Sequence, residues 1–164
     1  MTDTSMDGAG RITVALQKVY IKDSSFEAPN SPEIFTGEWR PSVSLNIGTK
    51  HAALGDDNYE VVLSLTADVK QGDKTAFLVE VHQAGIFVLK GLNEQDLGQV
   101  VGTFCPQQLY PYAREVISDL SGKGGFPQLH LQPVNFDGLA AEARRRQEAQ
   151  AAAGAGAEAP RTEG

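Results

Sequence analysis

The sequence predicts an α+β fold, a four-stranded antiparallel sheet backed by one long helix, with a shorter helix near the C-terminal end. Three observations predict this arrangement. Before residue 90, apolar and polar residues alternate over four segments, as in half-buried strands. After Gly91 the apolar period changes to about 3.6 residues, which is typical of an amphipathic helix. The links between the strands are short enough to indicate an antiparallel meander.

The first strand is expected from Ile12, and a change of phase near residues 17–18 indicates a bulge or a bend. Residues 23–41 are expected to be irregular, because their prolines exclude a central strand or a helix. This loop carries four large apolar side chains, Phe26, Ile34, Phe35 and Trp39. Such a loop either packs against the body as local core or presents its apolar surface to a ligand, and both interpretations stay open.

The other three strands are expected at residues 43–47, 59–69 and 75–89, with a hairpin turn at 71–73. In the fourth strand apolar residues occupy both faces, and Gly85 indicates a bulge or a bend. One long helix can cover only one face of the sheet. Because leftover apolar area is normally buried by self-association, we expect an oligomer.

Asn93 is expected to cap the long helix, with Glu94 and Asp96 in the first turn, where carboxylates are favourable to the helix dipole. Pro106 must break or kink this helix, because proline lacks the backbone N–H that the helix interior needs. The glycine-rich residues 122–125 are expected to end it.

An extended connector is expected at 126–136, followed by a last helix that Asp137 caps and that runs through the arginines at 144–146. The chain should form one domain between two unstructured ends. The expected organisation is a disordered N-terminus at 1–10, a single domain at 11–150 and a disordered Ala/Gly-rich tail at 151–164.

The composition is that of an ordinary globular protein, since 41% of the 164 residues are hydrophobic and 21% are charged. The formal net charge of −7 falls entirely within residues 1–139. Such a surface repels nucleic-acid phosphates and anionic lipids and attracts basic partners, although solubility alone explains the acidity equally well. We expect no nucleic-acid binding and no direct membrane insertion.

No segment approaches the roughly 20 apolar residues of a membrane helix, and the polar N-terminus is unlike a signal peptide, so we expect a cytoplasmic protein. The single cysteine, Cys105, excludes an intrachain disulfide and agrees with a reducing compartment. With one cysteine and three scattered histidines, we expect no structural zinc site and no cofactor.

No catalytic group emerges from the residue pattern. Cys105 lies mid-helix beside a proline, where packing is the expected role, and no G-x-S-x-G motif is present. Asp56 and Asp57 are expected in a loop, and the glycine-rich residues 121–125 follow a helix, whereas a phosphate loop precedes one. His82 is expected to be a structural or rim histidine. We therefore expect a binding protein and no enzyme.

An acidic rim around an apolar spot is the strongest binding feature. Glu80 should share a sheet face with Leu78 and His82, because side chains alternate along a strand. With Asp23 and Glu27 nearby, this face predicts a docking site for a basic, partly apolar peptide. A solvated sheet face explains the same pattern, and the residues alone leave the choice open.

Five ordered segments resemble the SecB family of protein-export chaperones. They are KDSSFEAPNSPEIF at 22–35, YEVVL at 59–63, AFLVEVHQAGIF at 76–87, CPQQLYPYARE at 105–115 and FPQLHLQPVNFDGL at 126–139. The resemblance spans residues 12–139 and implies the same sheet and long helix, assembled as a homotetramer that is a dimer of dimers. It also implies ATP-independent holding of unfolded preproteins in the bacterial cytoplasm, followed by delivery to the SecA translocation ATPase.

The resemblance also implies roles for particular residues. Docking of SecA, through its zinc-containing basic C-terminal tail, is implied for Asp23, Glu27, Leu78 and Glu80. Client binding in apolar grooves is expected for Phe26, Phe35, Trp39, Leu45, Phe104, Leu109, Phe136 and Leu139. An effect on tetramer assembly is expected for Val79, Val81, Gln83, Leu97 and Val101.

The last helix departs from the family pattern, because residues 138–146 offer mainly Leu139 as a large apolar side chain. We expect it to contribute less to client or SecA contact, and we interpret the arginines at 144–146 as a solvated face. Three alternative functions are compatible with a small acidic domain of this kind. A SecB-like chaperone dedicated to a toxin–antitoxin pair is disfavoured by the SecA-docking residues. A small enzyme with a cavity between sheet and helix lacks an acid–base pair, and a SecA adaptor without client binding is the third.

Overall fold

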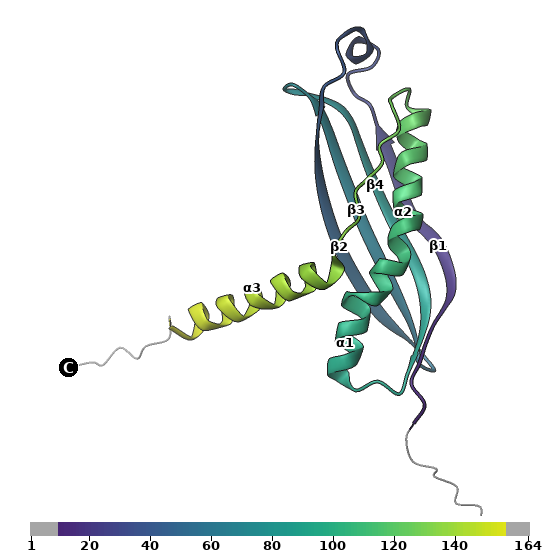
Figure 1. Cartoon of the computed structure of the whole chain (residues 1–164), viewed down its shortest axis with the longest axis vertical. Coiled ribbons are helices and arrows are strands. Elements are labelled where there is room, and N and C mark those ends of the chain that lie inside the picture. Colours follow the sequence, from purple (N-terminus) through teal and green to yellow (C-terminus); the bar gives the residue numbers. More distant parts are fainter. Residues whose placement is uncertain (1–9, 157–164) are drawn as a thin grey trace, which may run out of the picture.

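The computed structural model describes residues 10–156, which form one sheet with helices on one side and a last helix that projects away from the sheet (Figure 1). The strands are β1 (Thr13–Glu27), β2 (Pro41–Gly55), β3 (Asn58–Gln71) and β4 (Lys74–Lys90). The helices are the 3₁₀ helix η1 (Glu33–Thr36), α1 (Glu94–Gly102), α2 (Phe104–Lys123) and α3 (Phe136–Gly156). The predicted α+β class is confirmed. Within the described residues, no helix is both long and apolar enough to cross a membrane.

Neighbouring strands are all antiparallel, as predicted, but the order β1-β4-β3-β2 is not that of a simple meander. Two-residue turns at 56–57 and 72–73 join β2 to β3 and β3 to β4. By contrast, β1 pairs with β4, and residues 28–40 carry the chain from one edge of the sheet to the other. This is a Greek-key connection. The meander prediction was wrong because only tight turns oblige consecutive strands to pair, and this link is long.

Strand β1 continues to Glu27, so residues 23–27, which were predicted to be irregular, belong to the sheet. Proline interrupts strand pairing only from Pro29 onward, and β1 lies at the edge of the sheet with a single partner. This correction matters for function, because it places two of the predicted docking residues on a strand.

The register between β1 and β4 shifts twice, between Leu16 and Lys18, where a bulge was predicted, and between Ile21 and Asp23. Each shift reverses which face the following side chains occupy. No register shift occurs at Gly85, where a bulge or bend was predicted. Glycine is needed there for close approach, because an added Cβ would lie 2.9 Å from Leu109 Cδ2 on α2.

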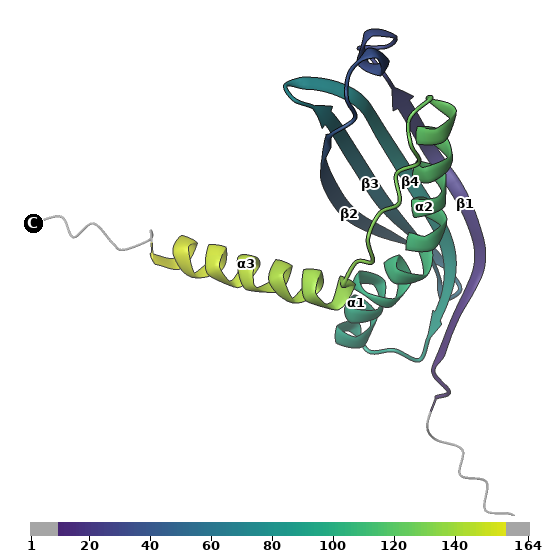
Figure 2. The same ribbon diagram turned by 45° about the horizontal axis from the view of Figure 1, so that its top comes forward.

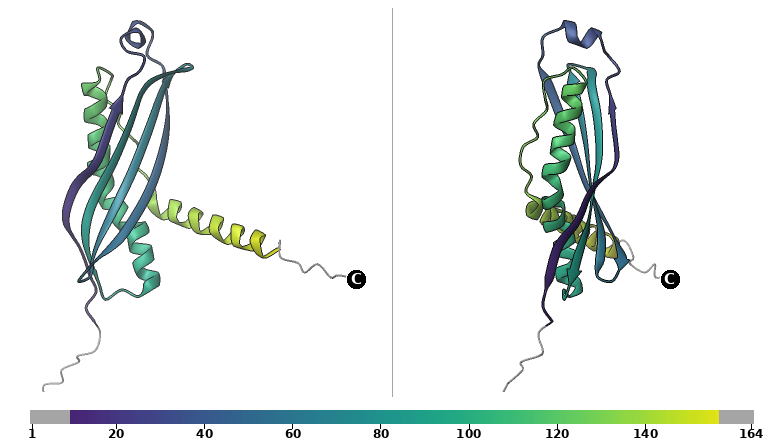
Figure 3. Two further views of the ribbon diagram at one scale, coloured as in Figure 1. Left: turned by 180° about the vertical axis from the view of Figure 1, so that it is seen from behind. Right: turned by 90° about the vertical axis from the view of Figure 1, so that its right-hand side faces the viewer.

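Helix α2 lies against one face of the sheet, α1 lies on the same side and packs against α2, and the other face is open (Figures 2 and 3). Alternate residues of β3 and β4 point to the covered face and are buried there: Val61, Leu63, Leu65, Ala67, Val69, Phe77, Val79, Val81, Phe87 and Leu89. Helix α2 presents Leu109, Ala113 and Ile117 to them, and all three are fully buried. The core therefore fills the layer between this sheet face and α2.

The predicted long helix is divided at Thr103 into α1 and α2. Asn93 caps α1 as predicted, because its side chain accepts a hydrogen bond from the Asp96 backbone N–H at 2.8 Å. Pro106 explains the division. It has no N–H to offer the Gly102 carbonyl one turn earlier, and its ring would clash with that carbonyl in a continuous helix. Proline is well tolerated in the first turn of the new helix α2.

Helix α3 is longer than predicted. It begins at Phe136 and ends at Gly156 instead of near residue 146. The predicted cap, Asp137, lies inside the helix, and Asn135 takes that role, since its Oδ1 accepts a hydrogen bond from the Gly138 N–H at 3.0 Å. Residues 151–156, which were predicted to be disordered, are thus helical. The prediction took Ala/Gly-rich composition as low complexity, but alanine has the highest intrinsic helix propensity. The rest of the predicted tail, at 157–164, and residues 1–9 of the predicted disordered N-terminus lie outside the described residues.

Candidate functional site: an acidic sheet face and an apolar groove

The open face of the sheet brings together residues from β1 and β4. The register pairs Glu27 with Leu78, Ser25 with Glu80 and Asp23 with His82. Directly paired residues of antiparallel strands point to the same face, so all four predicted docking residues share one surface. We call Asp23, Glu27, Leu78 and Glu80, together with His82, the acidic face. The second register shift in β1 is what turns Asp23 and Glu27 to this side.

Strand β3 extends the acidic face with polar residues. Its Ser64, Thr66 and Asp68 lie opposite His82, Glu80 and Leu78. The His82 imidazole contacts two side chains: Nδ1 lies 3.2 Å from the Ser64 hydroxyl, and Nε2 lies 2.6 Å from Glu80 Oε1. Leu78 is half-buried among these polar groups. The surface is therefore acidic with a small apolar centre, as the alternation predicted.

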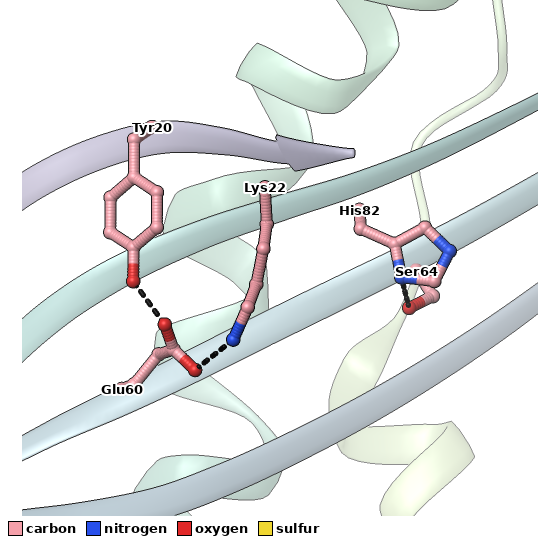
Figure 4. A network of polar contacts seen from close by, with 5 residues as sticks. All are labelled: Tyr20, Lys22, Glu60, Ser64 and His82. Atoms are coloured by element: carbon pink, nitrogen blue, oxygen red, sulfur yellow. Dashed lines mark hydrogen bonds and ion pairs between the residues drawn. The ribbon is translucent and has the colours of Figure 1, made fainter. Parts of the chain in front are cut away.

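Beside the acidic face, a second polar cluster ties the edge strand to the sheet (Figure 4). Tyr20 of β1 donates its hydroxyl hydrogen to Glu60 of β3, and Lys22 Nζ lies 2.7 Å from the other oxygen of that carboxylate. The hydrogen bonds from Lys22 and then Tyr20 lower the pKa of Glu60. Burial, followed by the hydrogen bond to Glu60, raises the pKa of Tyr20 to about 12. The cluster spans β4, which lies between the two strands.

A groove of about 920 Å³ lies between β2, α1 and the start of α3. Leu45 and Ile47 of β2 and Phe136 and Leu139 of α3 supply its apolar lining. Helix α1 forms another wall along its length, with the carboxylates of Glu94 and Asp96 in its first turn. Arg144 of α3 also lines the groove. It can therefore take an apolar segment that has polar or charged neighbours.

An aromatic cluster forms where the 28–40 loop meets the connector after α2. Phe126 lies at its centre, with ring centroids 4.9 Å from Phe35, 5.5 Å from Trp39 and 4.8 Å from Phe77. Phe26 stacks on Phe77 at 5.5 Å. The loop thus packs as local core, one of the two interpretations, yet Phe35 keeps 47% of its surface exposed. The role of Phe126 was missed, because a lone aromatic residue in an extended connector shows no periodicity.

The predicted client-binding residues fall into separate places. Leu45, Phe136 and Leu139 line the groove. Phe26, Phe35 and Trp39 belong to the aromatic cluster, and Phe104 stands apart with 39% of its surface exposed. Leu109 is fully buried against the sheet and cannot contact a client in this fold. The position of Leu109 in the apolar stripe of the helix predicts burial, whereas its client-binding role was expected only from the family resemblance.

The predicted assembly residues lie mainly inside the chain. Val79, Val81, Gln83 and Val101 are buried, and Leu97 is half-buried. Gln83 donates a hydrogen bond from Nε2 to the Tyr20 carbonyl at 3.0 Å, while its Oε1 has no partner among residues 10–156. Any influence of these residues on assembly would pass through packing of the sheet and helix.

The described residues offer little for catalysis. Burial raises the pKa of the Cys105 thiol to about 12, so it stays protonated and a poor nucleophile. Asp56 and Asp57 form the turn between β2 and β3, with φ of 53° and 61°, as a two-residue hairpin requires. Within residues 10–156, no group of three His, Cys, Asp or Glu side chains could hold a metal ion.

Comparison with known proteins gives a consistent result. The family model described as preprotein translocase subunit SecB matches residues 8–147. The chain is 55% identical over 139 residues to the protein-export protein SecB of Hahella chejuensis, covering 85% of this chain and 87% of that protein. It is 53% identical over 141 residues to the protein of the same name in Nitrosococcus oceani, covering 85% and 86%.

A solved structure shares the fold at much lower sequence identity. It is a SecB-like chaperone of Mycobacterium tuberculosis in complex with a ChAD peptide from the HigA1 antitoxin. The TM-score is 0.63 at 19% identity, covering 74% of this chain and 91% of that chain. This likeness supports the sheet and helix arrangement described above.

Proposed function

Because this chain belongs to the SecB family of preprotein translocase subunits, we propose that it is an export chaperone that binds unfolded preproteins and delivers them to SecA without using ATP. One observation carries the proposal beyond the family. The strand register gathers Asp23, Glu27, Leu78 and Glu80 on the open sheet face, while the apolar groove lies elsewhere. The chain thus offers a separate surface to each of the two proposed partners.

The groove and the exposed part of the aromatic cluster are proposed to hold clients. Unfolded chains expose apolar segments, and burial stabilises them by about 25 cal/mol per Å² of apolar surface. One groove would bind weakly after the ordering of a flexible segment is counted. We propose a homotetramer, in which several segments of one client occupy several grooves and gain avidity from their linkage. Fast-folding proteins would bury those segments before capture.

The acidic face is proposed to dock SecA through its basic, zinc-containing C-terminal tail, the zinc belonging to SecA. Lysine and arginine side chains would meet Asp23, Glu27 and Glu80, and the half-buried Leu78 would give one apolar contact. Charge complementarity of this kind increases the rate of association and the specificity. The cytoplasm is the proposed location, since clients and SecA would be met there.

A chaperone dedicated to a toxin–antitoxin pair is the second candidate, and it has less support. The structure with an antitoxin peptide is 19% identical to this chain, whereas relatives at 49–55% identity are named for protein export. The third candidate, a small enzyme, has still less support, because the relatives named above are export chaperones.

The test separates the two surfaces with matched variants. A denatured, slow-folding preprotein is diluted into the protein without nucleotide, while refolding and the mass of the complex are followed by light scattering. We expect arrested refolding and a complex of four chains with one client. Leu139→Asp in the groove should weaken holding by about ten-fold, roughly the loss of one buried leucine. Leu54→Asp, an exposed leucine outside the groove, is the control.

SecA binding is then measured for the same set and for a Leu78→Ala, Glu80→Ala double variant. The double variant should lose SecA binding and keep client holding, whereas Leu139→Asp should do the reverse. If the preprotein refolds at its normal rate and no complex forms, the chaperone proposal is refuted. Loss of both activities in either variant would contradict the separation of the two surfaces.

A further inference from the structure

His82 lies at one end of the acidic face, next to Glu80 along β4, yet the docking role described above assigns it no contact. Its Nε2 lies 2.6 Å from Glu80 Oε1 and its Nδ1 lies 3.2 Å from the Ser64 hydroxyl. The side chains of His82 and Glu80 are 32% and 45% exposed, so both reach solvent and an arriving partner. A carboxylate oxygen can only accept a hydrogen bond, so Nε2 must carry the hydrogen.

The contact with Ser64 then accommodates both charge states of the ring. In the neutral ring Nδ1 is an acceptor, and the Ser64 hydroxyl donates to it. In the protonated ring Nδ1 carries a hydrogen, and the same hydroxyl accepts it after a rotation about its C–O bond. Figure 4 shows the Ser64 side chain of β3 facing the His82 ring. A proton can therefore be taken up without moving a strand or breaking the contact with Glu80.

We propose that His82 is a proton-sensitive positioning residue that sets the affinity of the acidic face for its basic partner. The neutral ring holds the Glu80 carboxylate in place and leaves its negative charge for the partner. The protonated ring forms an ion pair with Glu80 and cancels that charge. Histidine is the residue type whose charge changes between about pH 5 and pH 8, so docking should weaken as the pH falls through this range.

Other charged residues lie near His82 on the neighbouring strands. From β1, Asp23 lies directly opposite His82, at the Cβ separation of about 4.5–5.5 Å that is usual for such pairs. Glu27 lies further along β1, and Asp68 of β3 lies opposite Leu78. The nearby ammonium group of Lys22 contacts Glu60, which offsets its charge. The carboxylate of Glu80 thus contacts His82 and Asp23 is its cross-strand neighbour, whereas Glu27 and Asp68 lie at the Leu78 end of the same surface.

This inference rests on the proposed SecA docking, and the experiment distinguishes the two. Binding of the full-length protein to SecA is measured at pH 6 and pH 8 for wild type, His82→Gln, His82→Lys and His51→Gln. The ratio of affinities between variants at one pH cancels any titration of SecA itself. Glutamine keeps an N–H for Glu80 without a charge, and lysine carries a charge at both pH values. His51 lies on β2 outside the acidic face and is the matched control.

The affinity of wild type relative to His82→Gln should fall by about two- to five-fold from pH 8 to pH 6, the scale of one exposed ion pair. His82→Lys should bind weakly at both pH values, and His51→Gln should follow wild type. A wild-type to His82→Gln ratio that is the same at both pH values would overturn the role of His82 while leaving docking intact. Absence of SecA binding for every variant at both pH values would overturn the docking function and the inference with it.

Discussion

Gly85 offers a sharp test of how the sheet and α2 fit together. An alanine Cβ at this position would lie 2.9 Å from Leu109 Cδ2, 3.0 Å from Phe87 Cε2 and 3.1 Å from the Lys18 carbonyl oxygen. Carbon atoms in optimal contact are about 3.5–4.0 Å apart, so the methyl group overlaps its neighbours, one of which is main chain. Overpacking of this kind costs about 1–3 kcal/mol. Against this, replacing a glycine within a strand by alanine stabilises the fold by about 0.5–1 kcal/mol, because glycine loses more backbone entropy on folding.

We therefore expect Gly85→Ala to lower the free energy of unfolding by about 1–2 kcal/mol. The assay is urea unfolding followed by circular dichroism at one fixed protein concentration, since assembly would make the apparent stability concentration-dependent. With a typical urea dependence of about 1–3 kcal/mol per molar, the midpoint should fall by roughly 0.5–1 M with an unchanged slope.

Gly48→Ala is the matched control, because it lies on β2 and its added Cβ would meet only the Ser64 Cβ, at 4.0 Å. Its midpoint should stay the same or rise slightly. Leu109→Ala should be strongly destabilising by itself and should cost less in the Gly85→Ala background, where it removes an overlapping atom. An unchanged midpoint for Gly85→Ala, or strict additivity with Leu109→Ala, would refute the packing argument.

Three further predictions follow from the polar cluster, the buried thiol and the aromatic cluster. Because the pKa of Glu60 is lowered in the folded state, its stabilisation is present above the ordinary value of 4.5 and is lost as the pH falls through the folded value. Acid unfolding monitored by circular dichroism should therefore begin at higher pH in Tyr20→Phe than in wild type, and identical profiles would contradict this. Native Cys105 should resist alkylation by iodoacetamide at pH 8 until denaturant is added, as mass spectrometry can show, whereas rapid native labelling would refute its burial. Trp39 is the single tryptophan, so its emission should shift when a client covers the aromatic cluster, and a saturating client without any shift would remove this cluster from the binding surface.

Side-chain alternation predicted which strand residues share a face, but it could not predict which strands are neighbours. Glu80, Leu78 and His82 lie together as expected, because a period of two depends only on local backbone geometry. The partner of β1 is decided by long-range pairing across the 28–40 loop, and no local pattern encodes it. The prediction that residues 23–27 are irregular was wrong for the same reason. It relied on prolines that occur only further along the chain, from Pro29 onward.

The helices show the same division between local and tertiary information. The Asn93 cap and the effect of Pro106 were predictable from single residues. The pattern could not show that the break falls at Thr103, or that Leu109 fills the space left by Gly85. Residue patterns alone could not predict the groove, because it is formed by side chains from β2, α1 and α3, which lie far apart in the sequence. Only the family resemblance pointed to Leu45, Phe136 and Leu139 in its lining.

The Greek-key connection has a consequence for how the chain reaches its fold. Strands β2, β3 and β4 are joined by two-residue turns and can pair as soon as they are synthesised. The first strand must wait, since it pairs Glu27 with Leu78 at one end and Thr13 with Lys90 at the other. Contacts between residues so distant in sequence form slowly. During translation, the β1 half of the acidic face therefore leaves the ribosome before the β4 half, and the face is completed only after His82 has emerged.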